Sequence, residues 1–158
     1  MNDRSTHNTM FRGVHAISMD SKGRMAVPAR FREPLMLACA GELVLTIDTE
    51  ELCLLLYPLS EWEVIQQKIE ALPSYNRQVR RIQRLLIGHA TDLEMDANGR
   101  ILVPGPLREH AALDKRIVLL GQGNKFEVWS EQRWQERRDA YLQDDAQDLP
   151  EALLELSL

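Results

Sequence analysis

The sequence predicts an α+β fold in which one strand-and-helix unit occurs twice. Residues 20–28 read DSKGRMAVP, and residues 96–104 read DANGRILVP. Apolar and polar residues alternate on both sides of each pattern, which is the period of a β-hairpin with one buried face. Each copy continues through two further apolar segments into a helical pattern. Because an internal repeat determines the architecture, these observations predict two pseudo-repeated halves.

The first half begins with a hairpin and two more strands. Asp20 can accept hydrogen bonds from amides two or three residues further on, and Gly23 can adopt the positive φ that closes such a turn. The apolar residues that alternate through this hairpin are Ile17, Met19, Met25 and Val27. The segments ELVLT (42–46) and CLLLYP (53–58) predict the next two strands.

A helix is expected after these strands. Ser60 and Glu63 form an S-x-x-E capping box, in which each side chain would satisfy a free backbone donor at the helix start. The apolar residues at helical spacing, which predict one buried stripe, are Trp62, Ile65, Ile69 and Leu72. Pro73 and Ser74 end this helix.

A second helical pattern links the two copies. It covers residues 75–87 and ends at Gly88. It carries a cluster of basic residues without any acid, namely Arg77, Arg80, Arg81 and Arg84.

The second half repeats the unit. Its matching turn residues and strands are Asp96, Gly99, Arg100 and Pro104, followed by RIVLL (116–120) and KFEVWS (125–130). Ser130 is the expected cap of a final helix, and Trp134 and Tyr141 lie on one face of it. The expected organisation is a disordered extension at 1–9, a first repeat at 10–72, a linker helix at 73–87, a second repeat at 88–143 and an acidic tail at 144–158.

Charge is unevenly distributed along the chain. The net charge is −5, with 19 Lys and Arg against 24 Asp and Glu. Residues 139–158 hold six of the acids and no Lys or Arg, so the remainder has 19 basic and 18 acidic residues, a net charge of +1. Local basic patches therefore matter more for nucleic-acid binding than the whole-chain charge.

Other classes of protein find little support. No run of 18 apolar residues predicts a membrane-spanning helix, and the first ten residues lack the apolar segment of a secretory signal. The four histidines are scattered, and GxSxG, HExxH and GxxxxGK[ST] motifs are missing. We therefore expect no enzyme, catalytic residue, cofactor, metal site or small-molecule substrate. Cys39 and Cys53 are expected to be buried free thiols, the alternative being a disulfide or a metal site.

The arginine of the turn has two possible roles. Arg24 could form an ion pair with Asp20 itself, or with Asp96 of the paired copy. Alternatively, it could contact phosphates or guanine edges, for which the bidentate guanidinium is suited. The other basic residues that would contribute to such a surface are Lys22, Arg30 and Arg32.

Several segments together resemble the MraZ family of bacterial transcriptional regulators. They are FRGVHAISMDSKGRMAVPARFRE, CLLLYPLSEWE, RRIQRLLIGHA, MDANGRILVPGPLR and GQGNKFEVW, and the resemblance covers residues 10 to about 134. It implies two tandem AbrB-like halves that form a double-split β-barrel with attached helices. It also implies a ring homo-oligomer, often of eight subunits, in the cytoplasm and associated with the nucleoid.

The resemblance further implies binding to double-stranded DNA that carries short G-rich direct repeats. These would lie upstream of the protein's own gene, at the head of the division and cell-wall gene cluster, where the family acts mainly as a repressor. The family's expected DNA contact falls on Arg24 and on its counterpart Arg100. Asn98 stands where the first copy has Lys22, and Arg30 has no counterpart. We therefore expect the first copy to dominate DNA contact, with the second partly structural.

An alternative from another class is a ring-shaped scaffold that binds DNA only non-specifically. Its acidic, leucine-bearing tail could dock partner proteins. Such a scaffold should be sensitive to substitution in the tail at Leu153, Leu154 and Leu156, and insensitive at Arg24.

Overall fold

The computed structural model describes residues 10–144 and 149–156, so the extension expected at residues 1–9 lies outside the described residues. The first half contains β1 (Phe11–Ser18), β2 (Arg24–Ala26), α2 (Ala29–Cys39), β3 (Glu42–Ile47), β4 (Leu54–Pro58) and α3 (Leu59–Glu70). The second contains β5 (Thr91–Glu94), β6 (Arg100–Leu102), α5 (Gly105–His110), β7 (Arg116–Gly123), β8 (Phe126–Ser130) and α6 (Glu131–Gln143). Between them lie α4 (Arg77–Ile82) and a π-helical turn η1 (Gln83–Ile87), and α7 (Glu151–Leu154) follows α6.

Each half has the same order of elements, strand, strand, helix, strand, strand, helix, which confirms the predicted repeat and the mixed α+β class. The helices α2 and α5 were not expected from the sequence. Each begins directly after the proline of its hairpin pattern, Pro28 or Pro104, which precedes the first helical residue. Pro34 inside α2 and the short length of α5 obscure their helical patterns.

The two halves share one antiparallel sheet of six strands, in the order β1-β7-β8-β4-β3-β5. The first strand of each half pairs with the third strand of the other, because β1 pairs with β7 and β5 pairs with β3. The strands β4 and β8 pair at the centre of the sheet and join the two halves. Exchanging equivalent strands of the two halves gives the same strand order read from the other edge. Because the halves are interleaved in one sheet, the domain boundaries expected from the sequence stay a prediction.

The sheet is open in the described part of the chain. Its edge strands, β1 and β5, each pair with one neighbour and not with each other. The strands β2 and β6 form a separate two-stranded ribbon. The closed double-split barrel that the resemblance implies is therefore not confirmed by the strand pairing.

The main core lies between one face of the large sheet and the ribbon with its helices. Phe11 stacks on Phe126 with ring centroids 4.2 Å apart, and Phe31 of α2 meets Phe11 and Phe126 edge-on at 5.7 and 5.1 Å. The alternating residues predicted to be buried, Met19, Met25 and Val27, all belong to this core, and Ile17 packs partly buried against it. The predicted burial pattern is therefore confirmed. The predicted β-hairpin is wrong, because β1 pairs with β7 and β2 pairs with β6, and the two strands meet only at the single bridge between Met19 and Met25.

A smaller cluster lies where α3 and η1 pack against β3 and β4. Trp62 and Ile69 are buried as predicted, but Leu72 is 45% exposed because α3 ends at Glu70. The capping box is wrong, since α3 begins at Leu59 and Ser60 makes no capping hydrogen bond. The chain passes from β4 through Pro58 into the helix, which places Ser60 inside the first turn.

The last predicted features concern a helix cap and the cysteines. Ser130 Oγ accepts a hydrogen bond from the amide of Arg133 at 3.4 Å, so this cap is confirmed. Both cysteines are free thiols; Cys53 is buried, whereas Cys39 is only half-buried. Burial is the main cause that raises the pKa of the Cys53 thiol.

The aromatic centre of the core gives a direct test of this packing. Truncating the fully buried ring in Phe126→Ala removes apolar contacts and leaves a cavity, so we expect a loss of about 3–5 kcal/mol in the free energy of unfolding. Denaturant titration at fixed protein concentration measures it. Leu37→Ala, at a side chain that is 72% exposed, is the matched control and should change stability by about 0.5 kcal/mol or less. Equal effects for the two variants would contradict the proposed core.

Candidate nucleic-acid interface

The two predicted turns have the same hydrogen-bonded construction. Asp20 Oδ1 accepts hydrogen bonds from the amides of Lys22 and Arg24, both at 2.9 Å. In the second half, Asp96 Oδ1 accepts from the amides of Asn98 and Arg100 at 2.8 and 2.9 Å. Gly23 and Gly99 have φ of 87° and 75°, the region that favours glycine, and each aspartate accepts from the amides two and four residues further on.

The turns lie at opposite ends of one ribbon. Met25 pairs with Ile101, and both side chains point into the core, each only 1% exposed. Side chains alternate along a strand, so the neighbours of this pair point to the outer face. Those outward residues are Arg24, Ala26, Arg100 and Leu102. The ribbon therefore carries one arginine from each half on the same face, on diagonally opposite positions.

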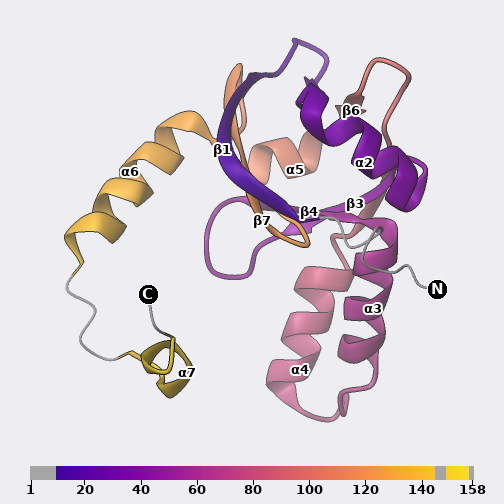
Figure 1. The fold of residues 1–158 in the computed structure, drawn as a ribbon. Coiled ribbons are helices and arrows are strands. Elements are labelled where there is room, and N and C mark those ends of the chain that lie inside the picture. Colours follow the sequence, from indigo (N-terminus) through magenta and orange to yellow (C-terminus); the bar gives the residue numbers. More distant parts are fainter. Residues whose placement is uncertain (1–9, 145–148, 157–158) are drawn as a thin grey trace.

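Backbone hydrogen bonds connect each strand to the turn of the other half. The amide of Val27 donates to the carbonyl of Gly99 at 2.8 Å, and the amide of Val103 donates to the carbonyl of Gly23 at 2.9 Å. The position of each turn therefore depends on the other half. Figure 1 shows β6 at the opposite end of the molecule from α3 and α4.

Arg24 forms the ion pair that the sequence left open. Its Nε lies 2.8 Å from Asp20 Oδ2, and the side chain is partly exposed. The hydrogen bond from the backbone amide of Arg24 is the largest cause that lowers the pKa of Asp20, so the carboxylate is ionised at neutral pH. Among the described residues, Arg24 makes side-chain hydrogen bonds only through Nε. The ion pair therefore orients the guanidinium and leaves its terminal amino groups as donors.

The other predicted basic residues surround this face unequally. Arg100 is exposed, and no ion pair to it occurs within residues 10–144 and 149–156. The hydrogen bond from the Arg100 amide is the largest cause that lowers the pKa of Asp96, and the charge of Arg24 lowers it further. Lys22 on the first turn and Arg30 at the start of α2 are both exposed. The guanidinium of Arg30 lies 4.9 Å from the centroid of the Phe31 ring.

Arg32 has a different environment from the rest. Its Nε donates to the carbonyl of Val27 at 2.8 Å, and a Cβ placed on Gly99 would overlap this nitrogen. Arg108 of α5 has the equivalent position beneath the first turn, where a Cβ placed on Gly23 would lie 2.7 Å from its Cζ. Each arginine therefore supports the turn of the opposite half, and a DNA contact by Arg32 stays a prediction.

Arg108 was missed in the sequence, although a signal for it was present. The two arginines are 76 positions apart, the same offset as Asp20 and Asp96, so the repeat aligns Arg108 with Arg32. Its buried Nε has no hydrogen-bond partner in the described structure, unlike that of Arg32. Arg32 and Arg108 are therefore equivalent in position but not in hydrogen bonding.

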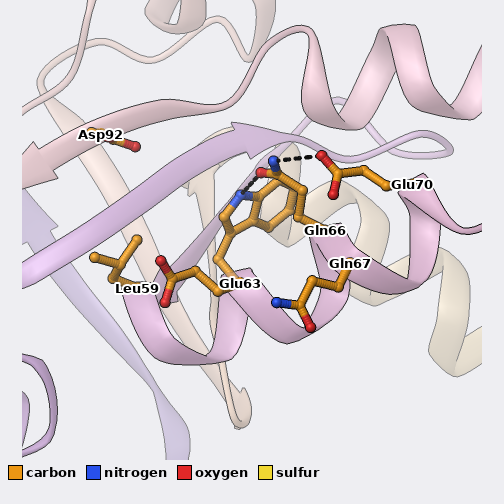
Figure 2. Close-up of a pocket in the computed structure, with 7 residues that line it drawn as sticks. Leu59, Glu63, Gln66, Gln67, Glu70 and Asp92 are labelled. Atoms are coloured by element: carbon orange, nitrogen blue, oxygen red, sulfur yellow. Dashed lines mark hydrogen bonds between the residues drawn. The ribbon is translucent and has the colours of Figure 1, made fainter.

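Other surfaces are distinct from this face. The cluster Arg77, Arg80, Arg81 and Arg84 is exposed on α4 and η1, away from the ribbon (Figure 1). A pocket of about 320 Å³ lies along α3, and Trp62 is among its lining residues. Figure 2 shows the carboxylates of Glu63, Glu70 and Asp92 that also line it. Carboxylates repel phosphate, so this pocket does not suit a nucleic-acid backbone.

The described segments contain neither a candidate metal site nor a candidate membrane-spanning helix. No group of three or more His, Cys, Asp or Glu residues is placed there to hold a metal ion. None of their helices is both long enough and apolar enough to cross a membrane.

Comparison with known proteins places this chain in a family. The family model described as "MraZ protein, putative antitoxin-like" matches residues 10–85 and again residues 86–154. The chain is 56% identical over 151 residues to the transcriptional regulator MraZ of Marinomonas sp. (strain MWYL1), covering 94% of this chain and all of the relative. It is 52% identical over 152 residues to the protein of that name from Legionella pneumophila (strain Corby), with the same coverage. The two matches to one family model confirm the repeat.

The support that Arg108 gives to the first turn can be measured. Gly23→Ala should cost more stability than Gly123→Ala, because both glycines have φ near 85° (87° and 83°) but only Gly23 faces the arginine. A Cβ placed on the control residue, Gly123, would lie in open space. The loss of about 1–2 kcal/mol in unfolding free energy that we expect for Gly123→Ala therefore reports backbone strain alone. Arg108→Ala in the Gly23→Ala background should abolish the excess in a double-mutant cycle of unfolding free energies. Identical losses for the two glycine variants would show that the arginine does not support the turn.

Proposed function

Because the chain belongs to the MraZ family, we propose that it is a DNA-binding transcriptional regulator that contacts DNA with the β2–β6 ribbon. One observation carries the proposal: Arg24 and Arg100, one from each half, lie on the outer face of the same ribbon. The relatives from Marinomonas and Legionella are named transcriptional regulators, which supports this class of function.

The major groove of B-DNA admits a two-stranded β-ribbon, and arginine is the commonest specific partner of guanine there. The terminal amino groups of Arg24 are oriented by its ion pair and available as donors, which suits bidentate contact with guanine O6 and N7. This chemistry is consistent with a preference for G-rich repeats. The exposed Lys22 and Arg30 would add phosphate contacts, which position the protein and supply salt-dependent affinity.

The two halves should contribute unequally. The first turn has Lys22 where the second has the neutral Asn98, and α5 has no counterpart of Arg30. Arg108 is turned beneath the first turn. The first half therefore carries the larger share of the contact, and Arg100 extends the same face.

A single ribbon offers few cations, so one subunit should bind weakly. A ring homo-oligomer would present several ribbons at a fixed spacing, and each contact would raise the effective concentration of the next. Direct repeats in the DNA would match successive subunits of such a ring. Binding to repeats upstream of its own gene, at the head of the division and cell-wall cluster, would repress transcription if the repeats overlap the promoter. Such binding would locate the protein at the nucleoid in the cytoplasm.

Substitution of the turn arginine tests this function. Arg24→Ala should weaken binding to a duplex with G-rich direct repeats by about tenfold or more, because a bidentate guanine contact contributes about 1–3 kcal/mol. Fluorescence anisotropy at several salt concentrations, with a scrambled duplex in parallel, measures both affinity and selectivity. Lys22→Ala should weaken binding to both duplexes equally. It should also reduce the slope of log affinity against log salt concentration by about 0.9. Arg138→Ala, an exposed arginine on α6, is the matched control.

Two results would contradict the proposal. Arg24→Ala could bind the repeat duplex as tightly as the unsubstituted protein, or the unsubstituted protein could bind both duplexes weakly and equally. The second result would favour the scaffold alternative.

A further inference from the structure

The α3–α4 hairpin carries a basic surface that the DNA-binding face does not use. We define the α4 patch as Arg77, Arg80, Arg81, Arg84 and Tyr75. The four arginines follow helical spacing and are all exposed, and Tyr75 is 89% exposed. Tyr75 lines a surface pocket of about 380 Å³ with three of them. In the described part of the chain, none of these arginines forms an ion pair.

The α4 patch is held in a fixed geometry. Asn76 Oδ1 accepts hydrogen bonds from the amides of Gln78 and Val79, which caps α4. Gln83 Nε2 donates to the carbonyl of Ile69, which ties the linker helix to α3. Leu72, three residues before Tyr75 in the turn between α3 and α4, is also exposed and adds apolar surface to this end of the pair of helices. The patch therefore combines four cations with an apolar edge.

The C-terminal arm has the complementary chemistry. We define the arm as the described residues that follow α6, namely Asp144 and residues 149–156. All of them are exposed, including four leucines, Leu149, Leu153, Leu154 and Leu156, at 44–67% exposure. Its acids are Asp144, Glu151 and Glu155, and it contains no Lys or Arg. Apolar side chains gathered on an exposed segment indicate a binding surface for another protein.

The arm begins from a fixed point. Trp134 packs edge-on against Trp129 with ring centroids 5.5 Å apart, which seats α6 on the sheet. Glu51, from the β3–β4 loop, then receives hydrogen bonds from Arg137 Nη2 at 2.7 Å and from the Tyr141 hydroxyl at 3.1 Å. Figure 1 shows α6 projecting from the body, with α7 beyond its end and apart from α4. The arm therefore extends outward and leaves its leucines uncovered.

We propose that the arm of one subunit docks on the α4 patch of a second copy. The leucines cover Tyr75 and Leu72, and Glu151 and Glu155 pair with the arginines. Each subunit has one arm and one patch, so the contact is heterologous and continues from copy to copy. The inference rests on the ring assembly of the proposed function and identifies the surfaces that join its subunits. It leaves the ribbon face free for DNA.

Charge reversal and rescue test this contact. R80E/R84E and E151K/E155K should each raise the protein concentration at which half of the subunits assemble, by about tenfold or more, and their combination should restore assembly. Leu153→Asp should weaken assembly similarly, whereas Leu37→Asp should not, although Leu37 on α2 is the more exposed leucine of the two, at 72% against 46%. Mass photometry and light scattering measure the species against the 18.2 kDa subunit. Circular dichroism checks that each variant is folded.

A second pair of variants makes the test specific. E63K/E70K reverses the charge of the acidic pocket of Figure 2, which is another surface that could attract the arginines. It should not rescue R80E/R84E, and rescue by this pair would overturn the proposal. Unchanged assembly of the arm variants would also overturn it, as would R80E/R84E weakening DNA binding without changing subunit number. A wild-type protein that stays a single subunit yet selects the G-rich duplex would overturn the docking while leaving the DNA-binding function intact.

Discussion

The pairing of β2 with β6 is the interaction on which the rest of the structure depends. It buries Met25 against Ile101 and, because side chains alternate, turns Arg24 and Arg100 to the opposite face. The amides of Val27 and Val103 then bond to the carbonyls of Gly99 and Gly23, so each turn is closed partly by the other half. One set of backbone hydrogen bonds thereby completes the core and assembles the candidate interface.

The same exchange between halves governs the large sheet. Because β1 pairs with β7 and β5 with β3, neither half has a complete sheet of its own, and an isolated half would expose unpaired strand edges and apolar surface. Arg32 and Arg108 repeat this exchange at the level of side chains, since each lies under the turn of the opposite half. The duplicated sequence therefore yields one fold in which each half depends on the other. A substitution in either turn should disturb both halves.

Local features of this fold could be predicted from the sequence, whereas relations between the halves could not. The turn roles of Asp20 and Gly23 follow from short-range hydrogen bonding and backbone freedom, and the alternation around Met25 specifies the buried face. Which strand pairs with which is a long-range relation, and nothing in a local pattern distinguishes β1–β7 pairing from pairing within one half. The ion pair of Arg24 could only be left as one of two roles, because a sequence pattern does not show that Asp20 bonds to Nε alone and leaves the terminal amino groups as donors. The cap predicted at Ser60 is wrong because the helix begins at Leu59, directly after Pro58, which is earlier than the capping pattern indicates.

If both turns belong to a single DNA-contacting face, DNA should protect both of them at once, which hydrogen–deuterium exchange measured by mass spectrometry can detect. Amide exchange would be compared for the free protein and for its complex with a duplex that carries G-rich direct repeats. Peptides covering residues 20–27 and 96–103 should gain protection together, while the exchange of peptides covering residues 77–84 should not change on DNA binding. Protection confined to residues 77–84, or no change at either turn, would show that the β2–β6 ribbon is not the DNA-contacting face.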